Sequence, residues 1–234
     1  MKFNILTLFP EFFNLLDDYG VIGRAIERKV IEINKINIRD FSTDKHKRVD
    51  DELYGGGAGM LMTPQPLYDS INSVKKEGVP VIYLSPQGRV LNQRLCNELA
   101  SLDEMTLLCG HYEGIDSRIT DEFVDMEISI GDYCLSGGEI GALVLIDSVS
   151  RLVKGVLGNE ESPLTDSHYN FLLQHNIYTR PRDFMGHKVP EVLFSGNHKL
   201  IEQWKEESAL ENTKKKRPDL YKKYLEEHGP NKGF

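Results

Sequence analysis

The chain contains the stretch Ser129-Ile-Gly-Asp-Tyr-Cys-Leu-Ser-Gly-Gly-Glu-Ile-Gly141, around which the rest of the sequence is organised. An apolar run with strand character, residues 124–130, leads into it, and an apolar run with helix character, residues 142–153, follows it. Glycines in and beside the turn allow a backbone to approach a ligand closely. A glycine-rich turn from a buried strand into a helix is a common place for a cofactor in α/β proteins. The alternative is a tight turn that holds no ligand.

Strand and helix patterns alternate on the N-terminal side of this stretch and across it. Strands are expected at residues 3–9, 31–38, 79–84, 105–109 and 124–130. Helices are expected at residues 10–16, 23–29, 64–74, 91–99, 115–123 and 142–153, with Thr63 capping the third of them. The alternation predicts an α/β fold with a parallel sheet and right-handed crossovers.

Three consecutive loops of this predicted sheet contain glycine, namely residues 84–88, 110–114 and 130–138. Each leaves the carboxyl end of a strand, so the three are expected to lie along one edge, where open α/β sheets bind ligands. We therefore expect one pocket rather than three unrelated turns. Apolar walls for a purine are available from Tyr83, Leu84, Ile130 and Leu135.

The phosphate-binding devices of nucleotide enzymes are missing from the sequence. No G-x-G-x-x-G follows the first strand, and there is no Walker P-loop. Their absence argues against NAD, FAD and ATP and favours a nucleoside ligand that carries no phosphate.

Composition limits the class of protein further. The 234 residues allow one large domain or two small ones, and the net charge of −8 requires any nucleic-acid contact to use local basic patches. The three cysteines, Cys96, Cys109 and Cys134, indicate reduced core residues of a cytoplasmic protein and have no zinc-ligand spacing. We expect neither a signal peptide nor a membrane span.

The regular alternation of strand and helix patterns ends after residue 153. Residues 155–167 show no period and indicate a linker, and a small second domain of helical character is expected from about residue 170. The basic runs 214–217 and 222–223 make this domain the better candidate for binding RNA. Ordinary solvated helix ends are the alternative explanation of those runs.

A set of short motifs spans almost the whole sequence. The motifs are Leu8–Pro10, Val49–Asp51 with Tyr54–Met60, Leu84–Gly88, Cys109–Asp116, Ile130–Glu139, Gly155–Ser162, Tyr178–Pro181, Leu193–His198 and Arg217–Leu220. None of them is decisive alone, but the set is specific. In these motifs and their order, the chain resembles the bacterial tRNA (guanine-N1)-methyltransferase family of the TrmD type, in the SPOUT superfamily.

The resemblance implies a fold and a reaction that the patterns alone do not. It implies a deep C-terminal trefoil knot in a SPOUT domain over residues 1–158, a linker over 159–175 and a helical tRNA-binding domain over 176–234. The implied methyl donor is S-adenosylmethionine, and the implied target is N1 of guanine 37, just 3′ of the tRNA anticodon. A cytoplasmic homodimer with shared active sites is also implied.

Carried over by motif, the resemblance assigns catalysis to Asp166 as general base and to Arg151 as the arginine paired with it. From the residues alone, Asp166 fits a helix N-cap and Arg151 a surface helix position. The chain departs from the family pattern at Lys154, Phe171 and Asn176-Ile177. The implied cofactor residues are Tyr83, Leu84, Pro86, Gly88, Gly110, Tyr112, Glu113, Gly114, Ile130, Gly131, Tyr133, Leu135, Gly137 and Gly138.

Two other functions stay open at this point. One is a SPOUT-type methyltransferase that acts on another RNA base, and the other is a non-catalytic RNA-binding module that keeps the fold. A hydrolase is disfavoured, because no Ser-His-Asp elbow or metal cluster is visible. No resident metal site is expected; assistance by Mg²⁺ is compatible with the sequence, but no residue pattern requires it.

Overall fold

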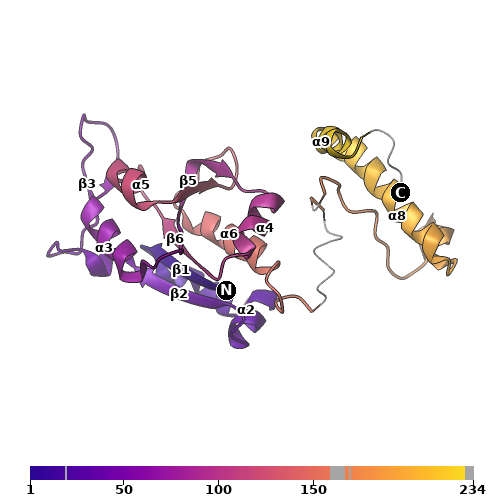
Figure 1. Ribbon diagram of the computed structural model, residues 1–234, viewed down its shortest axis with the longest axis horizontal. Helices are drawn as coiled ribbons and strands as arrows, with labels where there is room; N and C mark the ends of the chain where they lie inside the picture. The colour runs from indigo at the N-terminus through magenta and orange to yellow at the C-terminus, as the bar shows by residue number, and fades with distance from the viewer. Residues whose placement is uncertain (19, 159–166, 169, 230–234) are drawn as a thin grey trace. The chain divides into compact units, whose positions relative to one another are not determined.

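The computed structural model describes residues 1–18, 20–158, 167–168 and 170–229. It divides into two compact units, Met1–Glu160 and Glu161–Phe234. The first unit holds the main sheet, and the second holds two helices near the C-terminus (Figure 1). Within the described residues, no helix is both long and apolar enough to cross a membrane.

A five-stranded parallel sheet with strand order β2-β1-β6-β5-β7 forms the centre of the first unit. The prediction of an α/β fold with a parallel sheet is therefore confirmed. The strands are β1 (Lys2–Thr7), β2 (Glu32–Asn37), β5 (Val81–Val90), β6 (Glu104–Cys109) and β7 (Met126–Ser129), and the pair β3 (Asp50–Asp51) and β4 (Leu61–Met62) forms a separate small ribbon.

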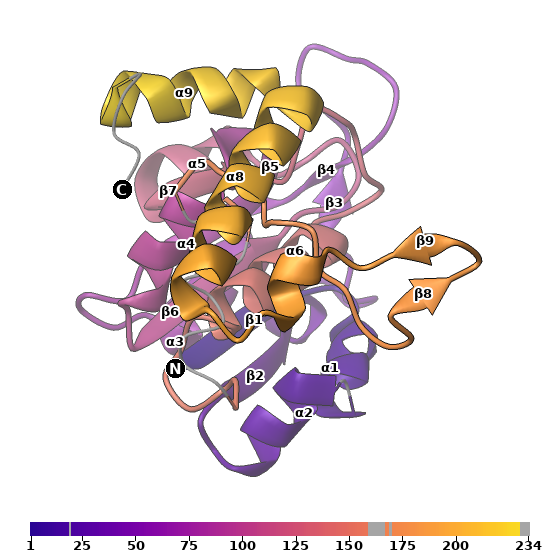
Figure 2. The same ribbon diagram turned by 90° about the vertical axis from the view of Figure 1, so that its right-hand side faces the viewer.

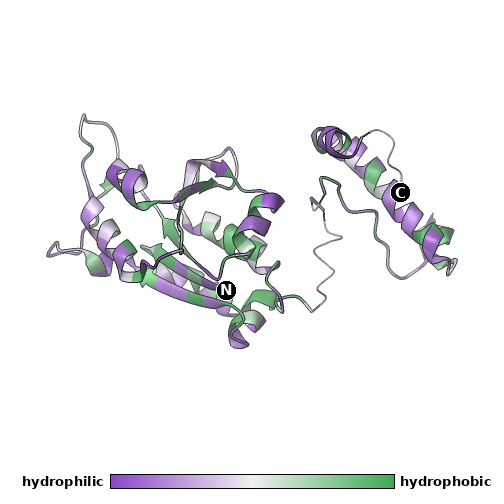
Figure 3. Cartoon of the chain, viewed as in Figure 1, coloured by the Kyte–Doolittle hydropathy of each residue, from purple (hydrophilic) through white to green (hydrophobic). Residues whose placement is uncertain are grey.

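The sheet is buried on both faces, because its strands alternate side chains between two apolar clusters. In β5, Ile82 and Leu84 join one cluster and Val81 and Tyr83 the other. Figure 3 shows hydrophobic colour on α6 and on parts of the strands, whereas the edge strand β2 is largely hydrophilic. The first face is covered by α2 (Gly20–Glu27), α4 (Gln93–Ala100) and α6 (Glu139–Ser150), with η1 (Pro10–Asn14) and α1 (Leu15–Asp18) beside them. The second face is covered by α3 (Pro64–Val74), α5 (Ser117–Phe123) and η2 (Ile38–Phe41).

Strand β5 is longer than the sequence predicts. Both Leu84 and Arg89 pair with Ile128 of β7, so residues 85–88 leave the ladder and the chain then returns to it. Pro86 and Gly88 lie where the register of this strand shifts, so the expected strand end at residue 84 is wrong. The strand resumes because β7 continues beside it and offers further backbone groups for pairing.

Two glycines allow segments of backbone to pass unusually close together. A Cβ on Gly88 would overlap the backbone of Glu127 and Ile128. A Cβ on Gly138 would lie 2.7 Å from the Cα of Cys109, and the Gly138 amide donates to the Gly110 carbonyl at 3.0 Å. No side chain fits at either crossing, because the obstructing atoms belong to backbone that cannot rotate away.

Two smaller expectations are wrong. The Thr63 hydroxyl donates to the carbonyl of Val49 at 3.2 Å and does not cap α3. Thr63 does hold the N-cap position as expected, but Pro66 at the third helical position has no amide, which leaves the Gln65 amide as the one possible partner for a side-chain cap. Cys134 is exposed on a loop, whereas Cys96 and Cys109 are buried as expected.

The second unit is built on α8 (His198–Lys216) and α9 (Pro218–His228), which meet at a steep angle (Figure 2). An extended segment packs on α8: the Leu173 amide donates to Thr213 Oγ1 at 2.8 Å, and the Asn176 amide donates to Ser208 Oγ at 3.0 Å. The unit also contains η3 (Glu191–Phe194) and a hairpin of β8 (Asp183–Phe184) and β9 (His187–Lys188), which the helical pattern did not predict.

We expect Gly88→Ala to destabilise the first unit by about 1–3 kcal/mol, the usual cost of forcing an extra methyl group into packed surroundings. Urea unfolding followed by circular dichroism measures this. Gly158→Ala is the control, because nothing lies within 4 Å of a Cβ at that position. Equal unfolding midpoints for the two variants would contradict the close crossing at Gly88.

Candidate functional site

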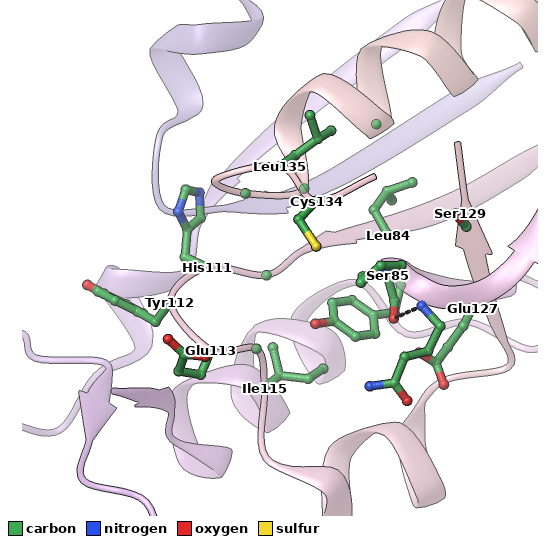
Figure 4. A pocket seen from close by; sticks show the side chains of 18 of the residues that line it. Leu84, Ser85, His111, Tyr112, Glu113, Ile115, Glu127, Ser129, Cys134 and Leu135 are labelled. Carbon is green, nitrogen blue, oxygen red and sulfur yellow. Dashed lines mark hydrogen bonds between the residues drawn. The ribbon is translucent and has the colours of Figure 1, made fainter. Parts of the chain in front are cut away.

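A cavity of about 610 Å³ lies beside the irregular middle of β5 and at the carboxyl ends of β6 and β7 (Figure 4). Residues 84–87, 110–115 and 128–138 supply most of its lining. The structure therefore brings the three glycine loops to one pocket, as expected. Its volume is within the range of about 300–1,000 Å³ that is typical of small-molecule sites.

Most of the predicted cofactor residues line this cavity. Gly88 is the exception, because it packs against the backbone of β7 instead. Arg151 is exposed just beyond the end of α6 and is not part of the lining. Asp166 lies outside the described residues. The residues that do line it are Tyr83, Leu84, Pro86, Gly110, Tyr112, Glu113, Gly114, Ile130, Gly131, Tyr133, Leu135, Gly137 and Gly138.

Tyr83 forms an inner wall of the cavity and is only 8% exposed. Burial, with the nearby Glu127 carboxylate as a second cause, raises the pKa of its phenol to about 12. The hydroxyl therefore keeps its proton at neutral pH. A Cβ on Gly110 would lie 2.8 Å from this hydroxyl, so glycine there leaves space beside the ring.

The loop 110–114 is fixed by backbone hydrogen bonds on both sides. Glu113 donates its amide to the Met60 carbonyl at 2.9 Å, and Met62 donates to the Gly114 carbonyl at 3.0 Å. Tyr112 adopts a φ of 59°, a region that non-glycine residues rarely occupy. Such a backbone persists only where the surroundings hold it, and it often marks a functional loop.

The charge of the lining is one-sided. Its carboxylates are Glu113 and Glu127, and no lysine or arginine is among the described residues that line it. Backbone groups and the hydroxyls of Tyr83, Ser85 and Ser129 supply further polar contacts. Such a cavity suits a ligand that carries positive charge and lacks phosphate groups, because phosphate would meet carboxylates without a compensating cation.

A buried hydrogen-bonded chain beside the cavity was not found from the sequence. Glu139, 5% exposed at the start of α6, accepts from Thr7 Oγ1 at 2.6 Å and bonds to His111 Nε2 at 2.7 Å. Its charge adds to the burial that raises the pKa of the Cys109 thiol well above the usual value. The only local signal was an acidic residue directly after Gly137-Gly138 at a helix start, where carboxylates are favoured.

The residues present fit S-adenosylmethionine, the donor that the resemblance implies. Leu84, Ile130 and Leu135 offer apolar surface to an adenine ring. The two carboxylates complement a cationic sulfonium and an ammonium group. Glycine backbone at Gly110 and Gly138 leaves amides and carbonyls open to close approach.

The parallel sheet and the cavity beside its glycine loops define an α/β protein with a pocket of small-molecule size. A family model described as "tRNA (Guanine-1)-methyltransferase TrmD" matches residues 1–223. The chain belongs to this family.

Curated relatives carry the same designation. A Finegoldia magna protein is 62% identical over 227 residues, which covers 97% of this chain and 97% of that protein. A Ruminiclostridium cellulolyticum protein is 54% identical over 226 residues, covering 95% of this chain and 97% of that protein. A Clostridioides difficile protein is 54% identical over 227 residues, covering 95% and 98%. All three are named tRNA (guanine-N(1)-)-methyltransferase.

The raised pKa of the Tyr83 phenol predicts how the stability of the protein changes at high pH. Its folded pKa of about 12 lies above the ordinary value of 10.0, so the folded state retains a proton that the unfolded state loses. Stability should therefore fall as the pH rises from about 10 towards 12, and Tyr83→Phe should reduce that fall. Urea midpoints at pH 8, 10 and 11 measure it.

Tyr54→Phe is the matched control for this series, because the Tyr54 side chain is fully exposed. It should keep the wild-type dependence on pH. If Tyr83→Phe also kept that dependence, the phenol would not be held in its neutral form by the fold.

Proposed function

We propose that this protein transfers a methyl group from S-adenosylmethionine to N1 of guanine 37 of tRNA. The observation that carries the proposal is the 62% identity, over 97% of both chains, to a protein named tRNA (guanine-N(1)-)-methyltransferase. The cavity of the first unit supports it, since its apolar walls and its carboxylates suit the donor. The enzyme would act in the cytoplasm, with free tRNA as substrate.

The donor would be held by residues of the three loops, with Leu84, Ile130 and Leu135 around the adenine and Tyr83 as a neutral hydrogen-bond donor. When bound, it supplies an electrophilic methyl group on a sulfonium. The protein orients the target nitrogen in line with that group, and orientation alone can contribute several orders of magnitude in rate. The Ser85 hydroxyl accepts from the Gln87 amide at 3.1 Å and so stiffens the 85–88 loop (Figure 4).

Guanine N1 carries a proton and is a weak nucleophile at neutral pH. Asp166 is proposed as the general base that accepts this proton, since carboxylates commonly do so. A free aspartate has a pKa of about 3.9, well below that of guanine N1. The transfer therefore needs a second group that stabilises the charge left on the base.

Arg151 is proposed as that second group. As N1 loses its proton, negative charge spreads to O6 of the guanine, and a guanidinium beside O6 stabilises it in the manner of an oxyanion site. Arg151 follows the last turn of α6 and is exposed, so it is accessible to a large substrate.

The chain is further proposed to form a trefoil knot near the cavity. Support comes from the double pairing of Ile128 with Leu84 and Arg89 and from the bridge between His111 and Gly137. True knots are rare, and ordinary topology rules would not suggest one. A backbone traced through experimental density from residue 80 to 150 tests the proposal, and an unthreaded path would contradict it.

The second unit is proposed to bind the tRNA. Its longest helix, α8, ends with Lys214, Lys215 and Lys216, and Arg217 follows, so positive charge gathers at one place on a chain of net charge −8. Lysine and arginine supply the phosphate contacts that dominate affinity for nucleic acids. The proposed boundaries are 1–158 for the methyltransferase domain, 159–175 for the linker and 176–234 for the tRNA-binding domain.

A homodimer with shared active sites is also proposed. Helix α6 contributes to the core, yet it exposes Ile140 (46%) and Val144 (40%), and Phe9, Phe12 and Leu15 are exposed on or beside η1, which contacts α6. Apolar surface on neighbouring elements commonly marks an interface between proteins. A second copy of this chain is the partner that the family resemblance implies.

We expect labelled methyl transfer to a tRNA transcript with G at position 37 and none to a transcript with A there. Asp166→Ala should lower kcat by about 10²–10⁴, the usual contribution of a general base. Binding of S-adenosylhomocysteine, measured by calorimetry, should survive. Asp121→Ala, a change at an exposed position of α5, is the matched control.

Each other outcome of this assay has a definite meaning. Transfer to both transcripts would place the target at another RNA base. Tight tRNA binding without any transfer by the wild type would favour a non-catalytic RNA-binding module. Full activity of Asp166→Ala would remove that residue from the mechanism. Running the assay with and without Mg²⁺ tests whether that ion assists.

Val144→Asp should shift the protein from dimer to monomer in sedimentation velocity, because the new charge would be buried at the proposed interface. Methyl transfer should fall with the dimer fraction if the sites are shared. Leu200→Asp, at an exposed leucine of α8, should leave the dimer intact. A dimer that persists in Val144→Asp would place the interface elsewhere.

A further inference from the structure

Glu139 links three parts of the chain that are far apart in sequence. Its Oε1 accepts from Thr7 Oγ1 at 2.6 Å, and its Oε2 bonds to His111 Nε2 at 2.7 Å. Thr7 ends β1, His111 belongs to the loop after β6, and Glu139 begins α6. Thr7 is fully buried and Glu139 is nearly so, and neither lines the cavity.

The same contacts join two walls of the cavity. His111 and Gly137 form an antiparallel bridge, and the Gly138 amide donates to the Gly110 carbonyl at 3.0 Å. A Cβ on Gly137 would overlap the His111 ring and lie 2.7 Å from Glu139 Oε2. Because Gly137 has no side chain, the Glu139 carboxylate and the His111 imidazole can form their hydrogen bond beside it.

The free energy of burying the Glu139 carboxylate favours the arrangement in which Thr7 and His111 both bond to it. A buried carboxylate is costly unless its oxygens are hydrogen-bonded, and here each oxygen has a partner. The Thr7 hydroxyl also accepts from the Phe9 amide at 3.0 Å, and the Phe9 ring meets the His111 ring edge-on, with centroids 5.0 Å apart. Movement of loop 110–114 away from α6 would break a short hydrogen bond to a buried charge.

We propose that Glu139 is a positioning residue for the methyl donor. Held by Thr7, it fixes His111 and thereby the spacing between loop 110–114 and loop 130–138, which sets the affinity of the cavity without contact between Glu139 and the ligand. The inference rests on the proposed function only in taking the ligand to be S-adenosylmethionine or its product.

Thr7 provides the sharpest test, since it is buried outside the cavity and reaches His111 through Glu139 and through Phe9 rather than by touching the ligand. Binding of S-adenosylhomocysteine to the full-length protein is measured by calorimetry. Glu139→Ala should raise Kd about tenfold or more, and Thr7→Val about threefold or more, as expected for loss of a hydrogen bond to a charged group. Glu139→Gln and Thr7→Ser, which keep hydrogen-bonding groups, should recover most of the affinity.

The double variant Thr7→Val/Glu139→Ala should bind no more weakly than Glu139→Ala, because both changes act on one chain of groups. In steady-state kinetics, KM for S-adenosylmethionine should rise while KM for tRNA stays within about twofold. Val149→Ala, which opens a cavity at a buried position of α6, is the control for general loss of stability. It should unfold at lower temperature and keep the wild-type Kd.

Wild-type affinity in both Glu139→Ala and Thr7→Val would overturn the inference and leave the proposed function intact. An equal loss of affinity in Val149→Ala would also overturn it, since the effect would then follow from stability alone. A wild-type protein that neither binds the product nor methylates tRNA would instead refute the proposed function and, with it, the inference.

Discussion

The close passage of backbone past backbone is the constraint on which this structure depends. At Gly88 the chain lies against the peptide of Glu127 and Ile128, and at Gly138 it lies against Cys109 and Gly110. A sheet of parallel strands needs crossovers, but it does not need its loops to pass one another without space for a methyl group. Because they do, three loops that leave different strands come near enough to enclose one cavity.

The chemistry of the cavity walls limits the kinds of ligand that the cavity suits. Glycines have no side chain, so their backbone amides and carbonyls are accessible to a ligand. Leucine and isoleucine side chains form the apolar part of the lining. The described lining offers two carboxylates and no lysine or arginine. Enzymes that bind nucleotides place helix N-termini and cationic side chains against the phosphate groups. The lining of this cavity is negatively charged instead, and it therefore suits a cationic nucleoside.

Local patterns predicted the sheet and its helices: the apolar run Val81–Leu84 is typical of a strand buried on both faces, and its side chains do alternate between two apolar clusters. They could not predict that β5 would return to pair with Ile128, since that register depends on a strand some forty residues away. Pro66, which lacks an amide, is a local sign against a side-chain cap at Thr63, but no local pattern indicates the contacts of Glu139. Its partners, 132 and 28 residues distant, meet it only in the folded chain.

The separation between Thr7 and Glu139 also concerns the order in which the protein is made. A ribosome synthesises Thr7 132 residues before the carboxylate that accepts its hydrogen bond, and the lining glycines Gly137, Gly138 and Gly141 are made at the same late stage as that carboxylate. Until then the nascent chain can pair β1 with β6, yet it cannot close the pocket. The lining of the cavity is therefore complete only after most of the first unit has been synthesised.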